Sequence, residues 1–210
     1  MKVLVVTNGT IADTDLLKRI VANHETILCA DGAVKYLRNI DRMPTKVVGD
    51  LDSISQDDLK WVKANHIPVL EYDVRKDFTD TEIAVTHALE LGASAITIAG
   101  AWGSRIDHSL ANLYLLKLIS EHQAEGMIVD GDLEISLISE NTTLSWKKGE
   151  TVSFIPVSEK ILGLTLKGFE YNLDAADLKM GSSRCISNVV AADNPKIQLK
   201  QGFLFAIRNK

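Results

Sequence analysis

The stretch Val47-Val48-Gly49-Asp50-Leu51-Asp52-Ser53 indicates how the chain folds and where it binds a ligand. Two β-branched apolar residues are typical of the end of a buried strand, and the glycine lets the backbone leave that strand close to a ligand. Asp50 and Asp52 would then follow the carboxyl end of the strand, where open α/β sheets bind ligands. Two carboxylates this close repel each other unless a cation neutralises them, and oxygen ligands of this kind suit magnesium.

A simpler interpretation is a polar turn in which Asp52 or Ser53 caps a helix. A second acidic stretch, Asp77-Phe78-Thr79-Asp80, favours the metal interpretation because it also follows an expected strand. Ser55 with Asp58, and Thr79 with Glu82, have the capping-box pattern of a helix start, and the second pair puts Asp80 in the first helical turn. There its carboxylate would either favour the helix dipole or bind a metal beside phosphate, and position alone does not separate these roles.

A glycine-rich stretch, Gly100-Ala101-Trp102-Gly103-Ser104-Arg105-Ile106-Asp107-His108, lies between a further expected strand and a helix. Gly100 and Gly103 would let backbone amides approach a phosphate, and Arg105 offers a planar fork for phosphate oxygens. Alternatively, Asp107 would cap the helix and His108 would lie on the surface. Neither G-x-x-x-x-G-K-[ST] nor G-x-G-x-x-G is present, so neither common loop would hold a nucleotide.

The length, composition and charge of the chain argue against some classes of function. The chain has 210 residues and a hydrophobic content of 46%, enough for one large or two small domains with a sizeable core. Its net charge of −5, without a block of like charge, argues against binding to nucleic acid or to a membrane surface. Since no apolar stretch is long enough for a signal-peptide core or a bilayer span, we expect a cytoplasmic protein.

Helical and strand periods alternate over residues 1–130, which predicts a mostly parallel, Rossmann-like α/β domain. After that the helical period disappears, and short segments separated by turn residues predict an antiparallel β-sandwich over residues 131–210. The strands expected in the sandwich are 133–138, 142–146, 151–155, 162–166, 169–173, 186–190, 197–199 and 203–207.

In order along the chain, three motifs resemble those of bacterial thiamine pyrophosphokinases. They are G-D-x-D-S at Gly49–Ser53, D-x-T-D at Asp77–Asp80 and G-A-x-G-x-R-x-D-H at Gly100–His108. A-D-G at Ala30–Gly32 and I-S-N at Ile186–Asn188 also fit that family. The resemblance covers nearly the whole chain, and the ordered set of motifs is specific.

The resemblance implies an enzyme that moves the diphosphate of ATP onto the hydroxyl of thiamine and releases AMP. It implies a homodimer in which residues 1–130 bind ATP and magnesium, while residues 131–210 help to bind thiamine at the subunit interface. Magnesium would be held by Asp50, Asp52 and Asp80, with Asp77 nearby, and one of these four would accept the hydroxyl proton. The resemblance assigns ATP binding to Asp31, Gly32, Gly100, Gly103, Arg105, Asp107 and His108, and thiamine binding to Ser187 and Asn188.

Two other functions remain open on the residues alone. A magnesium-dependent phosphohydrolase would also use paired aspartates, but the aspartyl-phosphate type needs its pair after the first strand. Here that strand ends in Thr7-Asn8-Gly9, which argues against this type. A non-catalytic nucleotide-sensing module would need the glycine and arginine turn but not two acidic stretches.

Overall fold

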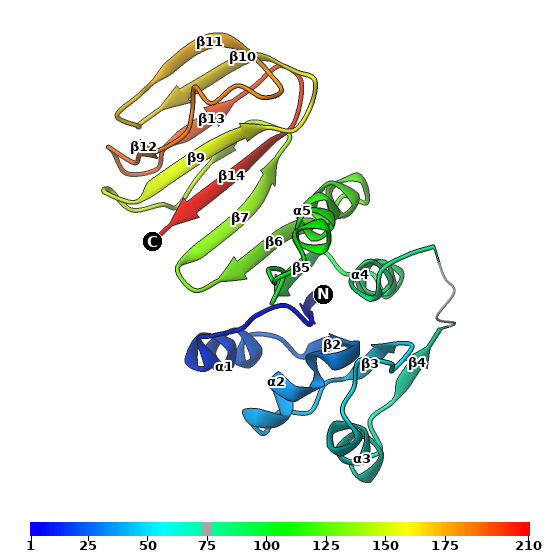
Figure 1. Cartoon of the computed structure of the whole chain (residues 1–210). Helices are drawn as coiled ribbons and strands as arrows, with labels where there is room; N and C mark the ends of the chain where they lie inside the picture. The colour runs from blue at the N-terminus through cyan, green and yellow to red at the C-terminus, as the bar shows by residue number, and fades with distance from the viewer. Residues whose placement is uncertain (73–76) are drawn as a thin grey trace. The chain divides into compact units, whose positions relative to one another are not determined.

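The computed structural model describes residues 1–72 and 77–210, which form two compact units, Met1–Gly131 and Asp132–Lys210. The first unit confirms the prediction of a parallel α/β domain. Its described strands pair in the order β6-β5-β1-β2-β3-β4, and every pair is parallel (Figure 1). The bounds are β1 (Lys2–Val6), β2 (Thr26–Ala30), β3 (Lys46–Gly49), β4 (Val69–Glu71), β5 (Ala95–Ala99) and β6 (Glu125–Asp130).

Helices cover both faces of this sheet, which explains why its central strands are continuous apolar runs. Leu4, Val6 and Cys29 belong to a buried cluster with residues of three helices, α1, α2 and α3. Two further helices, α4 and α5, contact each other and the opposite face. The bounds are α1 (Thr14–Ala22), α2 (Val34–Asn39), α3 (Gln56–Ala64), α4 (Asp80–Glu90) and α5 (Ile106–Glu121). In the described part of the chain, no helix combines the length and apolarity that a membrane span requires.

The strand order reverses between β1 and β5, and the loops that follow these strands are in contact. The Gly9 amide donates to the Gly100 carbonyl at 3.0 Å, and the Thr10 amide donates to the Trp102 carbonyl at 2.5 Å. A Cβ on Gly9 would lie 2.1 Å from the Trp102 oxygen, so only glycine fits there. Open α/β sheets bind ligands at such a reversal, outside the carboxyl ends of the strands.

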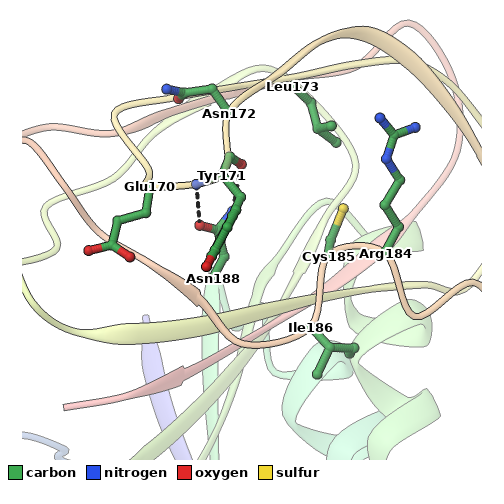
Figure 2. Close-up of a pocket in the computed structure, with 8 residues that line it drawn as sticks. All are labelled: Glu170, Tyr171, Asn172, Leu173, Arg184, Cys185, Ile186 and Asn188. Carbon is green, nitrogen blue, oxygen red and sulfur yellow. Dashed lines mark hydrogen bonds between the residues drawn. The ribbon is translucent and has the colours of Figure 1, made fainter.

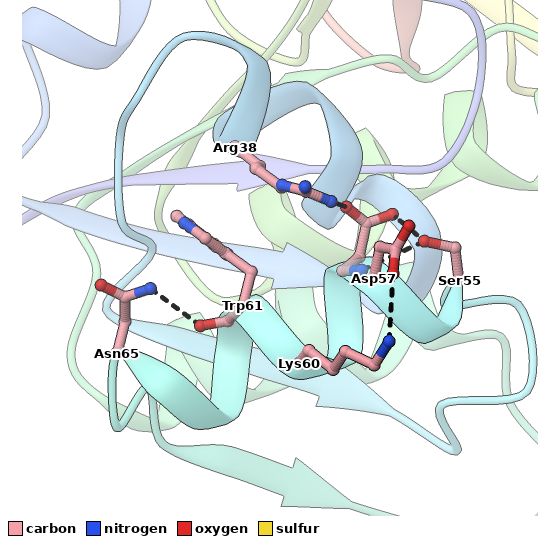
Figure 3. A network of polar contacts seen from close by, with 7 residues as sticks. Arg38, Ser55, Asp57, Lys60, Trp61 and Asn65 are labelled. Atoms are coloured by element: carbon pink, nitrogen blue, oxygen red, sulfur yellow. Dashed lines mark hydrogen bonds and ion pairs between the residues drawn. The ribbon is translucent and has the colours of Figure 1, made fainter.

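Local side-chain caps set the helix starts beside this edge, as the sequence predicts. Thr79 Oγ1 accepts the Glu82 amide at 3.1 Å at the start of α4. Ser55 caps α3 by accepting the Asp58 amide at 3.1 Å, and Figure 3 shows its side chain at that helix start. Asp107 does not cap α5, contrary to one expectation, because the cap position belongs to Arg105 and Asp107 lies inside the first turn.

The second unit is the expected antiparallel β-sandwich. Its two sheets have the strand orders β12-β9-β14-β7 and β11-β10-β13-β8, with antiparallel pairs. Alternate residues such as Val152 and Phe154 enter a core that Leu164 and Leu166 complete from the other sheet. The strands are β7 (Leu133–Ile138), β8 (Thr142–Thr143), β9 (Thr151–Pro156), β10 (Lys160–Lys167), β11 (Leu173–Lys179), β12 (Asn188–Val189), β13 (Lys196–Gln198) and β14 (Leu204–Asn209).

One strand prediction in this unit is wrong, and two others are too long. Residues 169–173 are not a strand, since Phe169 makes only an isolated bridge to Val190, and the strand here is β11. β11 lies at a sheet edge and buries only Leu178, so its polar sequence carries no strand signal. The strand expected at 142–146 is limited to Thr142–Thr143, and the strand expected at 186–190 is limited to Asn188–Val189.

Replacing Ser55 by alanine tests the cap of α3. The change removes a hydroxyl that accepts the Asp58 amide and donates to the Asp58 carboxylate at 2.6 Å. We expect the free energy of unfolding to fall by about 1 kcal/mol, a typical cost of losing an N-cap. Urea unfolding followed by circular dichroism measures this change, and Ser55→Thr, which keeps the hydroxyl, serves as the control. An unchanged midpoint in Ser55→Ala would contradict the assigned role.

Candidate functional site

A pocket of about 500 Å³ lies at the carboxyl ends of the parallel strands in the first unit. The loops after β1, β2, β3 and β5 line it, together with the first turns of α4 and α5. Three separate stretches singled out in the sequence therefore meet in one place. Of the predicted site residues, the pocket is lined by Asp31, Asp50, Asp52, Asp80, Gly103, Arg105 and His108.

Asp31, Asp50 and Asp52 each offer one carboxylate oxygen, and these atoms all lie within 4.8 Å of one another. The three come from the ends of the neighbouring strands β2 and β3. Asp80 approaches from α4, because a Cβ on Gly49 would lie 3.1 Å from its Oδ1 and 3.0 Å from the Asp31 Cβ. Because Gly49 lacks a Cβ, Asp31 and Asp80 can both lie close to the end of β3.

The crowding changes the protonation of these acids. Burial raises the pKa of Asp31, and the charge of Asp80 adds to that rise, while a hydrogen bond from Ser53 opposes it. The pKa of Asp52 is raised mainly by the neighbouring charge of Asp50. Each shift means that the ionised carboxylate is less stable here than in water.

Asp31 has one further feature that fits a cation. Its Oδ1 is buried and has no hydrogen-bond partner among the described residues. Its backbone φ is +44°, in the left-handed region that favours glycine and, among other residues, aspartate and asparagine. A divalent cation would give the orphaned oxygen a partner and relieve the repulsion, so the donor set fits a hard, oxygen-ligated metal such as magnesium.

The glycine and arginine turn also lines the pocket. The Gly103 amide donates to Ser109 Oγ at 3.3 Å at the start of α5. The Arg105 guanidinium donates to both carboxylate oxygens of Asp107, at 3.2 and 2.5 Å, and these bonds lower the pKa of Asp107 to about 2. Since a guanidinium has five N–H donors, Arg105 keeps donors for an anion while this pair holds its orientation.

Two predicted glycines support the pocket without lining it. Gly100 has φ +75°, and a Cβ there would lie 2.5 Å from the Thr7 carbonyl oxygen. A Cβ on Gly32 would lie 2.6 Å from Asn8 Nδ2 and 2.7 Å from the Ser53 carbonyl oxygen. Both glycines therefore let neighbouring loops pack closely. Asp77 and Asp107 are exposed and are not among the described residues that line the pocket.

A second pocket of about 440 Å³ lies within the second unit, and Figure 2 shows its lining residues. Asn188 lines it but is buried, and its amide group holds the backbone of Tyr171. Its Oδ1 accepts the Tyr171 amide at 3.0 Å, and its Nδ2 donates to the Tyr171 carbonyl at 2.8 Å. Ser187 is exposed and is not among the lining residues. The other lining residues are Glu170, Asn172, Leu173, Arg184, Cys185 and Ile186.

Sequence reasoning missed several residues of the first pocket, including Asn8, Ser109 and Asn112. Asn112 is buried, and its Nδ2 donates to the Ala101 carbonyl at 2.9 Å, which holds the loop after β5. The loop after β1 could have been recognised as a candidate part of the site, because it follows an apolar run typical of a strand buried on both faces. Its proximity to β5 depends on the strand order, which no local pattern specifies.

Two family models match this chain. One, described as the catalytic domain of thiamin pyrophosphokinase, matches residues 17–128, and the other, described as the vitamin B1 binding domain of the same enzyme, matches residues 135–204. Among curated proteins, the chain is similar to a thiamine pyrophosphokinase of Bacillus subtilis. The two are 32% identical over 196 residues, which cover 89% of this chain and 88% of that protein.

Solved structures agree with these matches. A crystal structure of thiamine pyrophosphokinase from Bacillus subtilis superposes with a TM-score of 0.91 at 28% identity, covering 100% of this chain and 99% of the other. A crystal structure of the thiamin pyrophosphokinase from Geobacillus thermodenitrificans gives 0.86 at 27% identity, with 100% and 98% covered. The likeness therefore extends over both units.

Proposed function

The chain belongs to the thiamine pyrophosphokinase family, and from this premise we propose how its residues divide the work of moving the diphosphate of ATP onto thiamine. The observation that carries the proposal is one pocket lined both by an acidic cluster and by a glycine and arginine turn. Family membership favours this activity over a magnesium-dependent phosphohydrolase and over a nucleotide-sensing module.

The acidic side of the pocket would hold magnesium. We propose the ligands that the sequence predicts, Asp50, Asp52 and Asp80, and add Asp31, whose oxygen lies within 4.8 Å of those of the first two. When bound there, the metal would neutralise phosphate oxygens and polarise the attacked phosphorus. The same carboxylates are the nearest candidates to accept the proton of the thiamine hydroxyl, because Asp77 lies outside the pocket lining.

The opposite side would hold the phosphate chain of ATP. Diphosphate transfer needs little covalent help from the protein, but it needs in-line positioning of the reacting groups. Arg105 would bind phosphate oxygens with the donors that Asp107 leaves, and the first turn of α5 would add backbone amides beside Gly103. His108 lines the same side, where it would contact the nucleotide.

The second unit would bind thiamine in its own pocket. Thiamine carries a cationic thiazolium ring, which favours the face of an aromatic side chain. Tyr171 is an aromatic residue of the pocket lining and is 67% exposed, so its ring is accessible. Asn188 would act mainly by fixing the Tyr171 backbone. The contact of Ser187 with thiamine that the sequence predicts would come from beside this pocket, because Ser187 is exposed and is not among the lining residues.

We also propose that the enzyme is a homodimer, with thiamine bound between subunits. Ile106, Leu110 and Tyr114 lie four residues apart on α5, on one face of the helix, and are 73%, 52% and 51% exposed. Such an apolar face is stabilised when a second copy covers it. A twofold arrangement would bring the thiamine pocket of one subunit to the acidic cluster of the other. The cytoplasmic location expected from the sequence stays a prediction.

A product assay tests the function. The protein is incubated with ATP, thiamine and magnesium, and the products are separated by chromatography. We expect AMP and thiamine diphosphate in equal amounts, because the diphosphate moves intact. Free phosphate without thiamine diphosphate would indicate the phosphohydrolase, and no turnover would indicate the sensing module.

Changing Asp52 to Asn tests the metal site, since it keeps the size of the side chain and removes its charge. If Asp52 only shapes a turn, Asn serves nearly as well. If it binds magnesium, we expect turnover to fall roughly a hundredfold or more, as when one electrostatic stabiliser is removed. Asp57→Asn, at an exposed residue of α3 outside the pocket, is the matched control. Near-normal turnover of Asp52→Asn at every magnesium concentration would refute the metal role.

Sedimentation and mixing of variants test the assembly. We expect a species of two 23.1 kDa chains at assay concentrations. Mixing Asp52→Asn with Tyr171→Ala and allowing subunits to exchange should restore up to about a quarter of the wild-type rate at low thiamine, since half of the random dimers contain one intact shared site. A fully active monomer, or no recovery after exchange, would exclude sites shared between subunits.

A further inference from the structure

Ser53 holds one oxygen of the Asp31 carboxylate by two hydrogen bonds. Its amide donates to Asp31 Oδ2 at 3.2 Å, and its hydroxyl donates to the same oxygen. The other oxygen, Oδ1, is the buried atom for which the described residues supply no partner. A carboxylate fixed through one oxygen presents the other in a defined direction, as outer partners do for metal ligands.

The Ser53 hydroxyl also accepts two hydrogen bonds. The Gly32 amide donates to it at 3.2 Å, and Asn8 Nδ2 donates at 3.3 Å. Since a serine hydroxyl has one proton and two lone pairs, these contacts use its full capacity and direct its proton to Asp31. The partners come from the loops after β1 and β2, whereas Ser53 follows β3. One hydroxyl therefore connects three loops of the pocket.

Asp31 needs such support because its backbone is left-handed, with φ +44°. A residue with a Cβ persists in that region only when its surroundings over-determine it. A Cβ on Gly32 would lie 2.7 Å from the Ser53 carbonyl oxygen, so the glycine next to Asp31 lets this loop lie close to Ser53. The helix-capping role that the sequence allowed for this part of the chain belongs to Ser55 instead.

We propose that Ser53 is a positioning residue, which orients the Asp31 carboxylate as a ligand for the cation at Asp50 and Asp52. It acts through Asp31 and through its contacts with Asn8 and Gly32, and it needs no contact with substrate. The inference rests on the proposed function, because the cation site is part of it.

The test measures binding of Mn²⁺ to the full chain without nucleotide, from the electron paramagnetic resonance signal of the free ion. We expect Ser53→Ala to raise the Mn²⁺ dissociation constant by about tenfold or more, the usual effect of removing a partner of a metal ligand. Ser53→Thr keeps the hydroxyl and should restore binding to near wild type, since residue 53 is exposed and has room for a methyl group. Ser55→Ala is the matched control, which lowers stability but leaves the dissociation constant unchanged.

Wild-type binding by Ser53→Ala would overturn the proposal. If that variant fails to fold, Ser53→Cys replaces it, since it keeps the size but donates weakly, with the same expected loss. The variant Asp50→Asn distinguishes a wrong role for Ser53 from a wrong proposed function. If Asp50→Asn also binds Mn²⁺ like wild type, the cation site itself is wrong and the proposal falls with it. If only Asp50→Asn loses affinity, the site stands and the role of Ser53 is refuted.

Discussion

Repulsion among carboxylates at the ends of two adjacent strands is the constraint on which the functional half of this chain depends. Asp31, Asp50 and Asp52 stay together because they follow β2 and β3, and the parallel pairing of these two strands fixes where each strand ends. Burial raises the pKa of Asp31, and the charge of Asp50 raises the pKa of Asp52, so the ionised forms of both are destabilised here. The packing of the sheet against its helices supplies the free energy that keeps these carboxylates close. A bound cation would offset part of their repulsion and so stabilise the folded state.

Local chemistry in the sequence predicted much of this architecture. A glycine after a β-branched pair located the end of β3, and Ser55 and Thr79 located two helix starts, because each signal acts within a few residues. The place of Asp31 in the acidic cluster was not predictable in this way. It depends on which strands are neighbours, and that order is set by packing over the whole sheet.

The second unit shows where residue patterns lose information. Strands that bury alternate residues, such as β9, were evident, whereas β11 faces water along most of its length and resembles a loop in sequence. Asn188 illustrates a similar limit for the site. A family motif marks it as a substrate contact, yet its amide group is occupied by the backbone of Tyr171. The three-dimensional contacts therefore reveal a role for Asn188 within the protein, while its contact with the substrate stays a prediction.

The left-handed backbone of Asp31 has a consequence for the engineering of this chain. Glycine would adopt φ +44° without strain, so a search for heat-resistant variants that measures only folding would favour Asp31→Gly. The same exchange would delete a carboxylate from the acidic cluster. Selection for stability and selection for catalytic activity therefore favour different residues at position 31. Libraries of variants screened for thermal stability should keep Asp31 unchanged.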